Sequence, residues 1–367
     1  MHVIAGDDES GKVLVNGSAV SGAGTWQNLL ARGAHVYQRL FHAYGDRMQW
    51  APYAAAAAAQ LVKRERVDVI LSTSPPLSTH AVAMQLKRQF NLFWIADFRD
   101  PLAGNPFAPE RQPFRSAVER SIMSGADMVL STTDVLAESW AKRYPKHRQK
   151  FHTIWNGFNP EEVIHAVSPP DTGPVVLSHI GEIYGARHPS IVLGSIARLL
   201  ASGRVRPEDV SIRLIGPVAE NSVMWRNPDF IHLRERGIVD CPDTRVTRVE
   251  SFKQMAAADQ LLLLDVNQGP MGVQLPAKLF DYIRVERTVM AQTIQGSPAD
   301  RVLAASGVRH TCLYSSDSEE QIDRKVLEAL RFPRVATPPN DWFWSQFDGR
   351  RQAQELARLI ESHTASR

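Results

Sequence analysis

Charged and polar side chains follow two apolar runs in the first half of this 367-residue chain. The run in "NLFWIADFRDPL" ends in Asp97, Arg99 and Asp100, and the run in "DVILSTSPPLSTH" ends in hydroxyl groups and His80. Carboxylates and imidazoles can orient a substrate hydroxyl or take its proton, and a guanidinium can bind an anion. A buried strand needs no such groups, so we expect them to face a ligand.

The second half contains a glycine-rich segment, "HIGEIYGARHP" (179–189). Gly181 and Gly185 permit close approach of the backbone, Tyr184 lies between them, and Arg187 adds a fixed positive charge. The segment follows a predicted strand and opens a predicted helix, whose free amides can bind an anion. We predict a diphosphate-binding loop, although the spacing is neither a Walker loop nor GxGxxG.

A second cluster of the same half lies in "LPAKLFDYI" (275–283), where Lys278 and Asp281 are three residues apart. On a helix this spacing puts both side chains on one face. The lysine can bind a phosphate, and the carboxylate can accept hydrogen bonds from a ribose diol. The alternative is an ordinary Lys/Asp surface pair.

The elements that position these residues alternate between short apolar runs and helical patterns. Fully apolar strands alternating with helices indicate a parallel sheet covered on both faces, with ligands beyond the carboxyl ends of the strands. Ala54–Ala59 is rich in helix-favouring alanine and is predicted as helix. The predicted strands of the first half are 68–73, 92–97, 127–132 and 150–158, with helices at 77–90, 113–126 and 134–145.

A linker, "SPPDTGP" (168–174), separates this half from a second alternation. Its predicted strands are 175–180, 210–216, 244–249, 260–266 and 288–293, with helices at 189–203, near 223–237, at 252–259 and at 275–284. We predict an α/β protein with two Rossmann-like domains facing a cleft, comprising residues 1–168 and 174–340. Residues 341–367 add a helix that packs back on the body through Leu356, Leu359 and Ile360.

Composition narrows the function classes. The formal net charge is +3, too weak by itself to indicate nucleic-acid binding. The two cysteines, Cys241 and Cys312, form no metal spacing and no disulfide framework. No run of eighteen apolar residues and no secretory signal pattern occurs. We expect a cytoplasmic protein without a bound metal.

Seven segments together resemble family-four glycosyltransferases in order and spacing, over roughly residues 60 to 310. They are "VDVILSTSPPLSTH", "WIADFRDPL", "ADMVLSTTD", "IWNGFNPEE", "HIGEIYGARHP", "ADQLLLLDV" and "LPAKLFDYI". The resemblance implies the GT-B fold of two Rossmann domains. It also implies retaining, metal-independent transfer from a nucleotide-sugar, with UDP as the default nucleotide, to a hydroxyl acceptor. The most similar members are bacterial enzymes of capsule, exopolysaccharide and lipopolysaccharide assembly.

The resemblance also implies roles for individual residues. Gly181 and Arg187 resemble the phosphate-side loop, to which we add Tyr184. Lys278 resembles the diphosphate lysine, and Asp281 replaces the usual ribose-binding glutamate. In the other half, Asp100 and Arg99 occupy the position where related enzymes have a catalytic or sugar-contacting polar pair. We add His80 as a catalytic candidate that could touch the sugar or the acceptor.

Structural interpretations of several residues remain open beside these roles. Asp97, Arg99 and Asp100 could form a structural ion pair with a helix-capping aspartate. His80 could be a satisfied histidine inside its helix. Asn156-Gly157 could border the cleft or form a tight turn. The basic segment 141–150 could face anionic lipid, which suits a lipid-linked acceptor at the inner face of the membrane, or be a solvated surface.

Two departures from the family pattern lead to an alternative function. Val273 and Gln274 stand where the family often has a sugar-contacting glutamate. The start, "MHVIAGDD", resembles the family's second strand, so the first βα unit of the N-terminal domain is expected to be missing. The alternative is a catalytically impaired nucleotide-sugar-binding protein. A third hypothesis, sugar-nucleotide epimerisation, needs more histidines and carboxylates around one sugar than the sequence offers.

Overall fold

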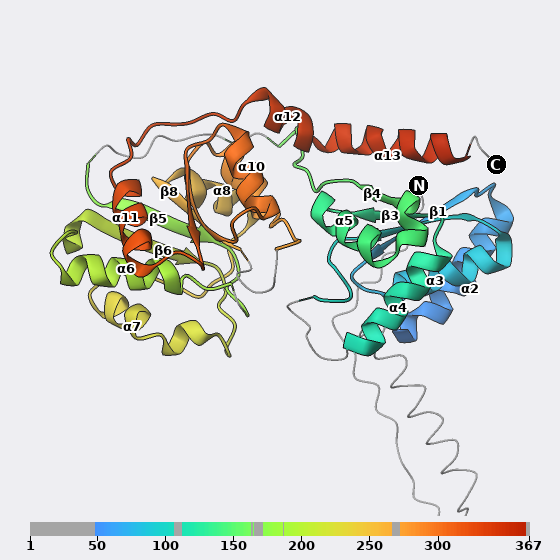
Figure 1. The fold of residues 1–367 in the computed structure, drawn as a ribbon, viewed down its shortest axis with the longest axis horizontal. Coiled ribbons are helices and arrows are strands. Elements are labelled where there is room, and N and C mark those ends of the chain that lie inside the picture. The colour runs from blue at the N-terminus through green and yellow to red at the C-terminus, as the bar shows by residue number, and fades with distance from the viewer. Residues whose placement is uncertain are drawn as a thin grey trace, which may run out of the picture. The chain divides into compact units, whose positions relative to one another are not determined.

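The computed structural model describes residues 48–105, 112–162, 164, 172–185, 187–265 and 272–364 (Figure 1). These residues fall into two compact units. Unit 1 extends to Leu130 and includes Ala141–His152, and unit 2 comprises Ser131–Trp140 and the chain from Thr153 onward. The prediction of a missing first βα unit concerns residues 1–47, which lie outside the described residues, as does most of the predicted linker.

Unit 1 contains a four-stranded sheet in the order β1-β2-β3-β4. Its strands are β1 (Val69–Ser74), β2 (Phe93–Phe98), β3 (Met128–Ser131) and β4 (Phe151–Thr153). The accompanying helices are α2 (Ala51–Arg64), α3 (Ser78–Phe90), α4 (Gln112–Gly125) and the 3-10 helix η3 (Pro145–Lys150). Helix α5 (Asp134–Arg143), which follows β3, belongs mostly to unit 2. Strands β1 and β2 pair in parallel, and the predicted alternation is confirmed.

Burial explains the apolar sequence of unit 1. In β2, Trp94, Ile95, Ala96 and Phe98 are completely buried, so both faces of the strand are covered. The alanine-rich segment is helical, as predicted, and packs on α3 through a buried stripe that includes Ala51, Ala54 and Ala55.

Unit 2 contains a six-stranded, entirely parallel sheet in the order β10-β9-β8-β5-β6-β7. The strands are β5 (Val175–Ile180), β6 (Val210–Ile215), β7 (Val239–Asp240), β8 (Gln260–Leu264), β9 (Thr288–Thr293) and β10 (His310–Tyr314). The helices are α6 (Ser190–Ala201), α7 (Pro228–Glu235), α8 (Arg248–Ala256), α9 (Lys278–Arg284), α10 (Pro298–Ser306), α11 (Glu319–Ala329), α12 (Asp341–Phe347) and α13 (Gly349–Thr364).

Two hydrophobic clusters cover the two faces of this sheet. Leu262 and Leu264 of β8 belong to the cluster with α6, α7 and α11, whereas Leu261 and Leu263 belong to the cluster with α8, α9 and α10 (Figure 1). Because successive side chains of a strand point to opposite faces, four consecutive leucines are needed when both faces are buried. The predicted doubly covered parallel sheet is confirmed.

Two element predictions were wrong. The segment 244–249 is not a strand, because Thr247 caps α8 by accepting a hydrogen bond from the Glu250 N–H at 3.2 Å. The strand predicted for 150–158 ends at Thr153. Gly157 forms no tight turn there: a Cβ at this position would lie 2.6 Å from the Phe347 carbonyl oxygen, so glycine is needed for close backbone packing.

The C-terminal helix α13 covers Gly349–Thr364, and Leu356, Leu359 and Ile360 are half-buried on it. Its packing on the body and the predicted domain bounds stay predictions. No helix within the described ranges has both the length and the apolar character needed to cross a membrane.

Candidate functional site

The carboxyl ends of β5 and β6 meet at two glycines. The Gly181 N–H donates to the Ile215 carbonyl at 2.7 Å, and the two glycines have φ values of +139° and +135°. A Cβ at Gly216 would lie 2.4 Å from the Gly181 carbonyl oxygen. Both positions therefore require glycine, because an L side chain would be strained and would collide with the neighbouring backbone or side chain.

Lys278, the first residue of α9, lies over Gly181 so closely that a Cβ there would be 1.7 Å from the lysine Nζ. Burial lowers the pKa of Lys278 to about 8, with a further lowering by the Arg187 guanidinium and a partial offset by Glu182. Within the described part of the chain, no carboxylate forms a salt bridge with this ammonium group. A cation held in this way can bind an anion.

Asp281, one turn further along α9, is buried and paired. Arg248 donates from Nη1 to Asp281 Oδ2 at 2.6 Å and from Nη2 to Oδ1 at 2.9 Å. Arg284 lies 3.9 Å from Oδ1. The alternative of a Lys278–Asp281 surface pair is therefore wrong: Asp281 pairs with Arg248, and Lys278 lies over Gly181.

Helix α9 is attached to the end of β5 by Tyr282. The Ile180 N–H donates to the Tyr282 hydroxyl at 3.0 Å, beyond the point where β5 pairs with β8. The preceding residue, His179, is completely buried, and burial lowers its pKa to about 3, so the imidazole is neutral. Its Nδ1 lies 2.9 Å from the Leu262 carbonyl oxygen. These contacts fix the strand end from which Gly181 follows.

The loop after Gly181 is closed by Tyr184 and Arg187. Arg187 donates from its backbone N–H to the Tyr184 carbonyl at 3.0 Å and from Nη1 to the Tyr184 hydroxyl at 2.6 Å. The guanidinium carbon also lies 5.4 Å from the centre of the Tyr184 ring. Arg187 thus adds positive potential near Lys278 from a fixed position.

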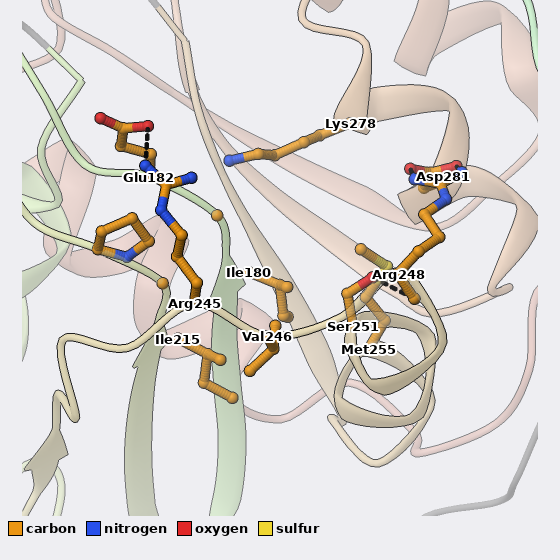
Figure 2. Close-up of a pocket in the computed structure, with 13 residues that line it drawn as sticks. Ile180, Glu182, Ile215, Arg245, Val246, Arg248, Ser251, Met255, Lys278 and Asp281 are labelled. Carbon is orange, nitrogen blue, oxygen red and sulfur yellow. Dashed lines mark hydrogen bonds and ion pairs between the residues drawn. The ribbon is translucent and has the colours of Figure 1, made fainter. Parts of the chain in front are cut away.

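A cavity of about 250 Å³, which we call the strand-end pocket, brings several of these residues together (Figure 2). Lys278 extends from α9 toward the end of β5, while Arg248 and Asp281 lie together on the other side of the pocket. The lining residues are Ile180, Gly181, Glu182, Ile215, Gly216, Pro217, Arg245, Val246, Arg248, Ser251, Met255, Lys278 and Asp281.

Sequence reasoning placed Gly181, Lys278 and Asp281 at this pocket but missed Gly216 and Arg248. Gly216 had a signal, since a glycine directly follows the apolar strand at 210–215. Arg248 was hidden in the segment predicted as a strand. Among the described residues, no group of three or more His, Cys, Asp or Glu side chains could hold a metal ion.

The polar residues of unit 1 lie at the end of β2 and just beyond it. Asp97 lies opposite Thr73 in the β1–β2 register and accepts a hydrogen bond from the Thr73 hydroxyl at 2.7 Å. Burial raises the pKa of Asp97, while Thr73 and Arg99 lower it. Arg99 is exposed and Asp100 is half-buried. Asp97 thus has a structural partner in β1, and Arg99 and Asp100 follow the last residue of β2.

His80 lies in the core of unit 1. It is completely buried, its Nδ1 is 2.7 Å from the Ser72 hydroxyl, and its ring centre is 4.7 Å from that of Phe98. Trp94 Nε1 donates to the same hydroxyl at 2.8 Å. Burial lowers the pKa of His80 to about 3, so the side chain is uncharged at neutral pH.

Comparison with known proteins now bears on this geometry. Residues 16–162 match the sequence model of Glycosyltransferase Family 4. This match supports the resemblance of the chain to family-four glycosyltransferases. A search of the curated proteins by sequence finds no match.

Solved structures show the fold of this chain. Sucrose-phosphate synthase from Thermosynechococcus elongatus is 15% identical, with a TM-score of 0.62 over 87% of this chain and 79% of that one. Anabaena HepE in complex with UDP and glucose is 14% identical, with a TM-score of 0.61 over 84% and 81%. The lipopolysaccharide outer core galactosyltransferase WaaB, in its apo form, is 14% identical, with a TM-score of 0.55 over 85% and 80%. The predicted GT-B fold is confirmed.

Proposed function

We propose that this glycosyltransferase binds a nucleotide-diphosphate sugar, UDP-sugar first among them, in the strand-end pocket of unit 2. The observation that carries the proposal is Lys278, a largely buried ammonium group without a carboxylate partner among the described residues, above the backbone of Gly181. Burying an unpaired charge is unfavourable unless a ligand neutralises it. A diphosphate supplies that charge, and the Anabaena HepE structures in complex with UDP support the choice of nucleotide.

Transfer of the sugar breaks its bond to the diphosphate, and negative charge grows on the leaving group. Fixed positive groups aimed at that charge lower the barrier more than groups that must reorganise. Arg187 is such a group, held by the hydroxyl and ring of Tyr184, and Lys278 is another, lying over the backbone of Gly181. We assign them to stabilisation of the leaving diphosphate, with Asp281 as acceptor for the ribose hydroxyls.

We further propose transfer with retention and without a metal. Both carboxylates of the strand-end pocket are paired with arginines, Asp281 with Arg248 and Glu182 with Arg245. Attack on the same face, with the leaving phosphate taking the acceptor proton, fits this lining better than a carboxylate nucleophile. In unit 1, Arg99 and Asp100 are the proposed acceptor-side groups, because they lie past the end of β2. The neutral, buried His80 shapes that strand end from within the core.

The acceptor and the pathway are proposed by analogy. The similarity to the lipopolysaccharide outer core galactosyltransferase WaaB supports a role in surface polysaccharide assembly with a lipid-linked or saccharide acceptor. Contact with anionic lipid at the inner membrane face is proposed through the basic segment 141–150. Two of its members have structural partners, since Arg143 donates to Glu119 and Lys150 to the Ala126 carbonyl. Lys142, Lys146 and Arg148 are the remaining basic side chains for such a contact.

The test uses a panel of nucleotide-sugars with a lipid-linked acceptor extract and measures release of nucleoside diphosphate, alongside calorimetric binding of UDP. We expect turnover with one donor, and roughly 10- to 100-fold weaker UDP binding in Lys278→Met, the size of a lost charge-assisted contact. Lys253→Met, an exposed lysine of α8, is the matched control. Nucleotide binding without turnover of any donor would favour the binding-protein alternative, and unchanged UDP binding in Lys278→Met would refute the proposed site.

A further inference from the structure

Arg248 is the most extensively bonded side chain of the strand-end pocket. It is the first residue of α8 and donates to both oxygens of Asp281. The same guanidinium donates from Nε to Glu162 Oε1 at 3.0 Å and from Nη2 to Glu162 Oε2 at 2.9 Å. Its carbon also lies 4.5 Å from the centre of the Phe252 ring. Two carboxylates and one ring therefore define a single position for this planar group.

The contact with Asp281 has the geometry that fixes a carboxylate. A fork of two parallel N–H donors holds both oxygens and so determines the plane of the group. An ionised carboxylate has about four acceptor sites, and the fork uses two of them. The remaining acceptor sites are available to a ligand in the strand-end pocket, which both Arg248 and Asp281 line. Arg248 therefore holds Asp281 in place without using up its capacity to accept hydrogen bonds.

Glu162 supports this arrangement from behind. It lies in the segment after β4 and bonds to Arg284 as well as to Arg248, at 3.3 Å and 2.9 Å. Arg284 in turn donates to the Glu162 carbonyl and lies 4.8 Å from the centre of the Phe158 ring. Glu162 therefore binds a second edge of the Arg248 guanidinium and helps to fix the orientation of the fork on Asp281.

We infer that Arg248 is a positioning residue for ribose recognition: it fixes the Asp281 carboxylate so that its free acceptor sites meet the two ribose hydroxyls of the nucleotide. The inference rests on the proposed function, in which Asp281 binds the ribose. It predicts that Arg248 matters for nucleotides that carry these hydroxyls and not for those that lack them.

The experiment compares calorimetric binding of UDP and of 2′,3′-dideoxy-UDP to the full chain. We expect the wild type to bind UDP at least about tenfold more tightly than 2′,3′-dideoxy-UDP, because the analogue cannot form the two hydrogen bonds to the charged Asp281 carboxylate. In Arg248→Met the binding of UDP falls to the level of the analogue, while binding of the analogue stays within about twofold of wild type. Arg248→Lys has a compact ammonium group instead of a fork. The ratio of its dissociation constants for the analogue and for UDP should lie between those of the wild type and Arg248→Met.

Controls separate positioning from folding. Arg236→Met removes an exposed arginine after α7 and should keep the wild-type ratio. Arg248→Met/Asp281→Asn removes both charges, so no unpaired carboxylate is left, and should bind the analogue normally without discriminating against it. Equal loss for both nucleotides in Arg248→Met and Arg248→Lys, or a full wild-type ratio in either, would overturn the inference. A wild type that binds both nucleotides equally would instead overturn the proposed role of Asp281.

Discussion

Lys278 shows how one side chain can be unfavourable for the free protein and useful to it when a ligand is bound. Its ammonium group is largely buried beside the Arg187 guanidinium, and burial together with this like charge lowers its pKa to about 8. The unfolded chain keeps the ordinary value of 10.5. Below pH 8 the folded protein must therefore hold a charge that its surroundings disfavour.

Replacing Lys278 with methionine is expected to stabilise the free protein. At pH 7 the unfolding free energy should rise by roughly 1–3 kcal/mol, the order of magnitude set by the lowered pKa. Since the unfolded state binds the proton more tightly, wild-type stability increases relative to the variant as pH rises from about 8 toward 10.5, and the difference disappears there. Urea denaturation at pH 7 and pH 10 measures this. A Lys278→Met variant less stable than wild type at pH 7 would contradict it.

Residue types that signal a ligand on their own could be predicted from the sequence, and residues defined by their partners could not. Gly181, Lys278 and Asp281 belong to segments with a recognisable order. Arg248 gains its meaning only from the fork on Asp281, 33 positions away in the chain. The burial of His80 likewise depends on Trp94 and Phe98 of the next strand, which sequence spacing does not reveal.

At the scale of elements, α9 connects the chemistry of the strand-end pocket to its support. Lys278 and Asp281 point into the pocket from this helix, while Leu279, Phe280 and Ile283 belong to the core below. Tyr282 reaches the end of β5 and accepts from the Ile180 N–H. One short helix thus fixes both the side chains of the site and the strand end beneath them.

Tyr282→Phe tests this connection. The substitution leaves the Ile180 N–H buried without its acceptor, which costs about 1–3 kcal/mol. We expect that loss in urea denaturation, and weaker UDP binding because the Gly181 loop is less firmly held. Tyr53→Phe, at a tyrosine that is 79% exposed, should stay within about 0.5 kcal/mol of wild type. A Tyr282→Phe variant as stable as wild type would show that another group satisfies this amide.

Buried strands were predictable because their composition repeats the same constraint at every residue. The four leucines of β8 are an example, since each contributes to one of two cores. The segment 244–249 alternates like a strand, but a single hydrogen bond to the Thr247 side chain starts a helix instead. Here the helix cap outweighs the weak alternation of apolar and polar residues. The sequence alone does not show which of these two signals determines the structure.

At the scale of the whole molecule, each unit has its own hydrophobic core and its own sheet. The sequence predicted this division, because its two stretches of alternating strands and helices each form one parallel sheet covered by helices. A ligand that binds only folded unit 2 stabilises that unit by mass action, and unit 1 gains nothing unless it unfolds together with unit 2. Nucleotide binding therefore allows the two cores to be distinguished.

Hydrogen exchange with UDP at about one hundred times its dissociation constant makes this measurable. Amides of β8 that exchange only when unit 2 unfolds should slow by about 100-fold, which corresponds to about 2.7 kcal/mol. Amides of β2, buried in unit 1, should exchange at the same rate with and without UDP. Lys278→Met is the control: its roughly 10- to 100-fold weaker UDP binding should reduce the slowing of the β8 amides to about 2- to 11-fold at the same UDP concentration. Equal slowing of β2 and β8 would mean that the units unfold as one, and slowing of β2 alone would move the nucleotide site to unit 1.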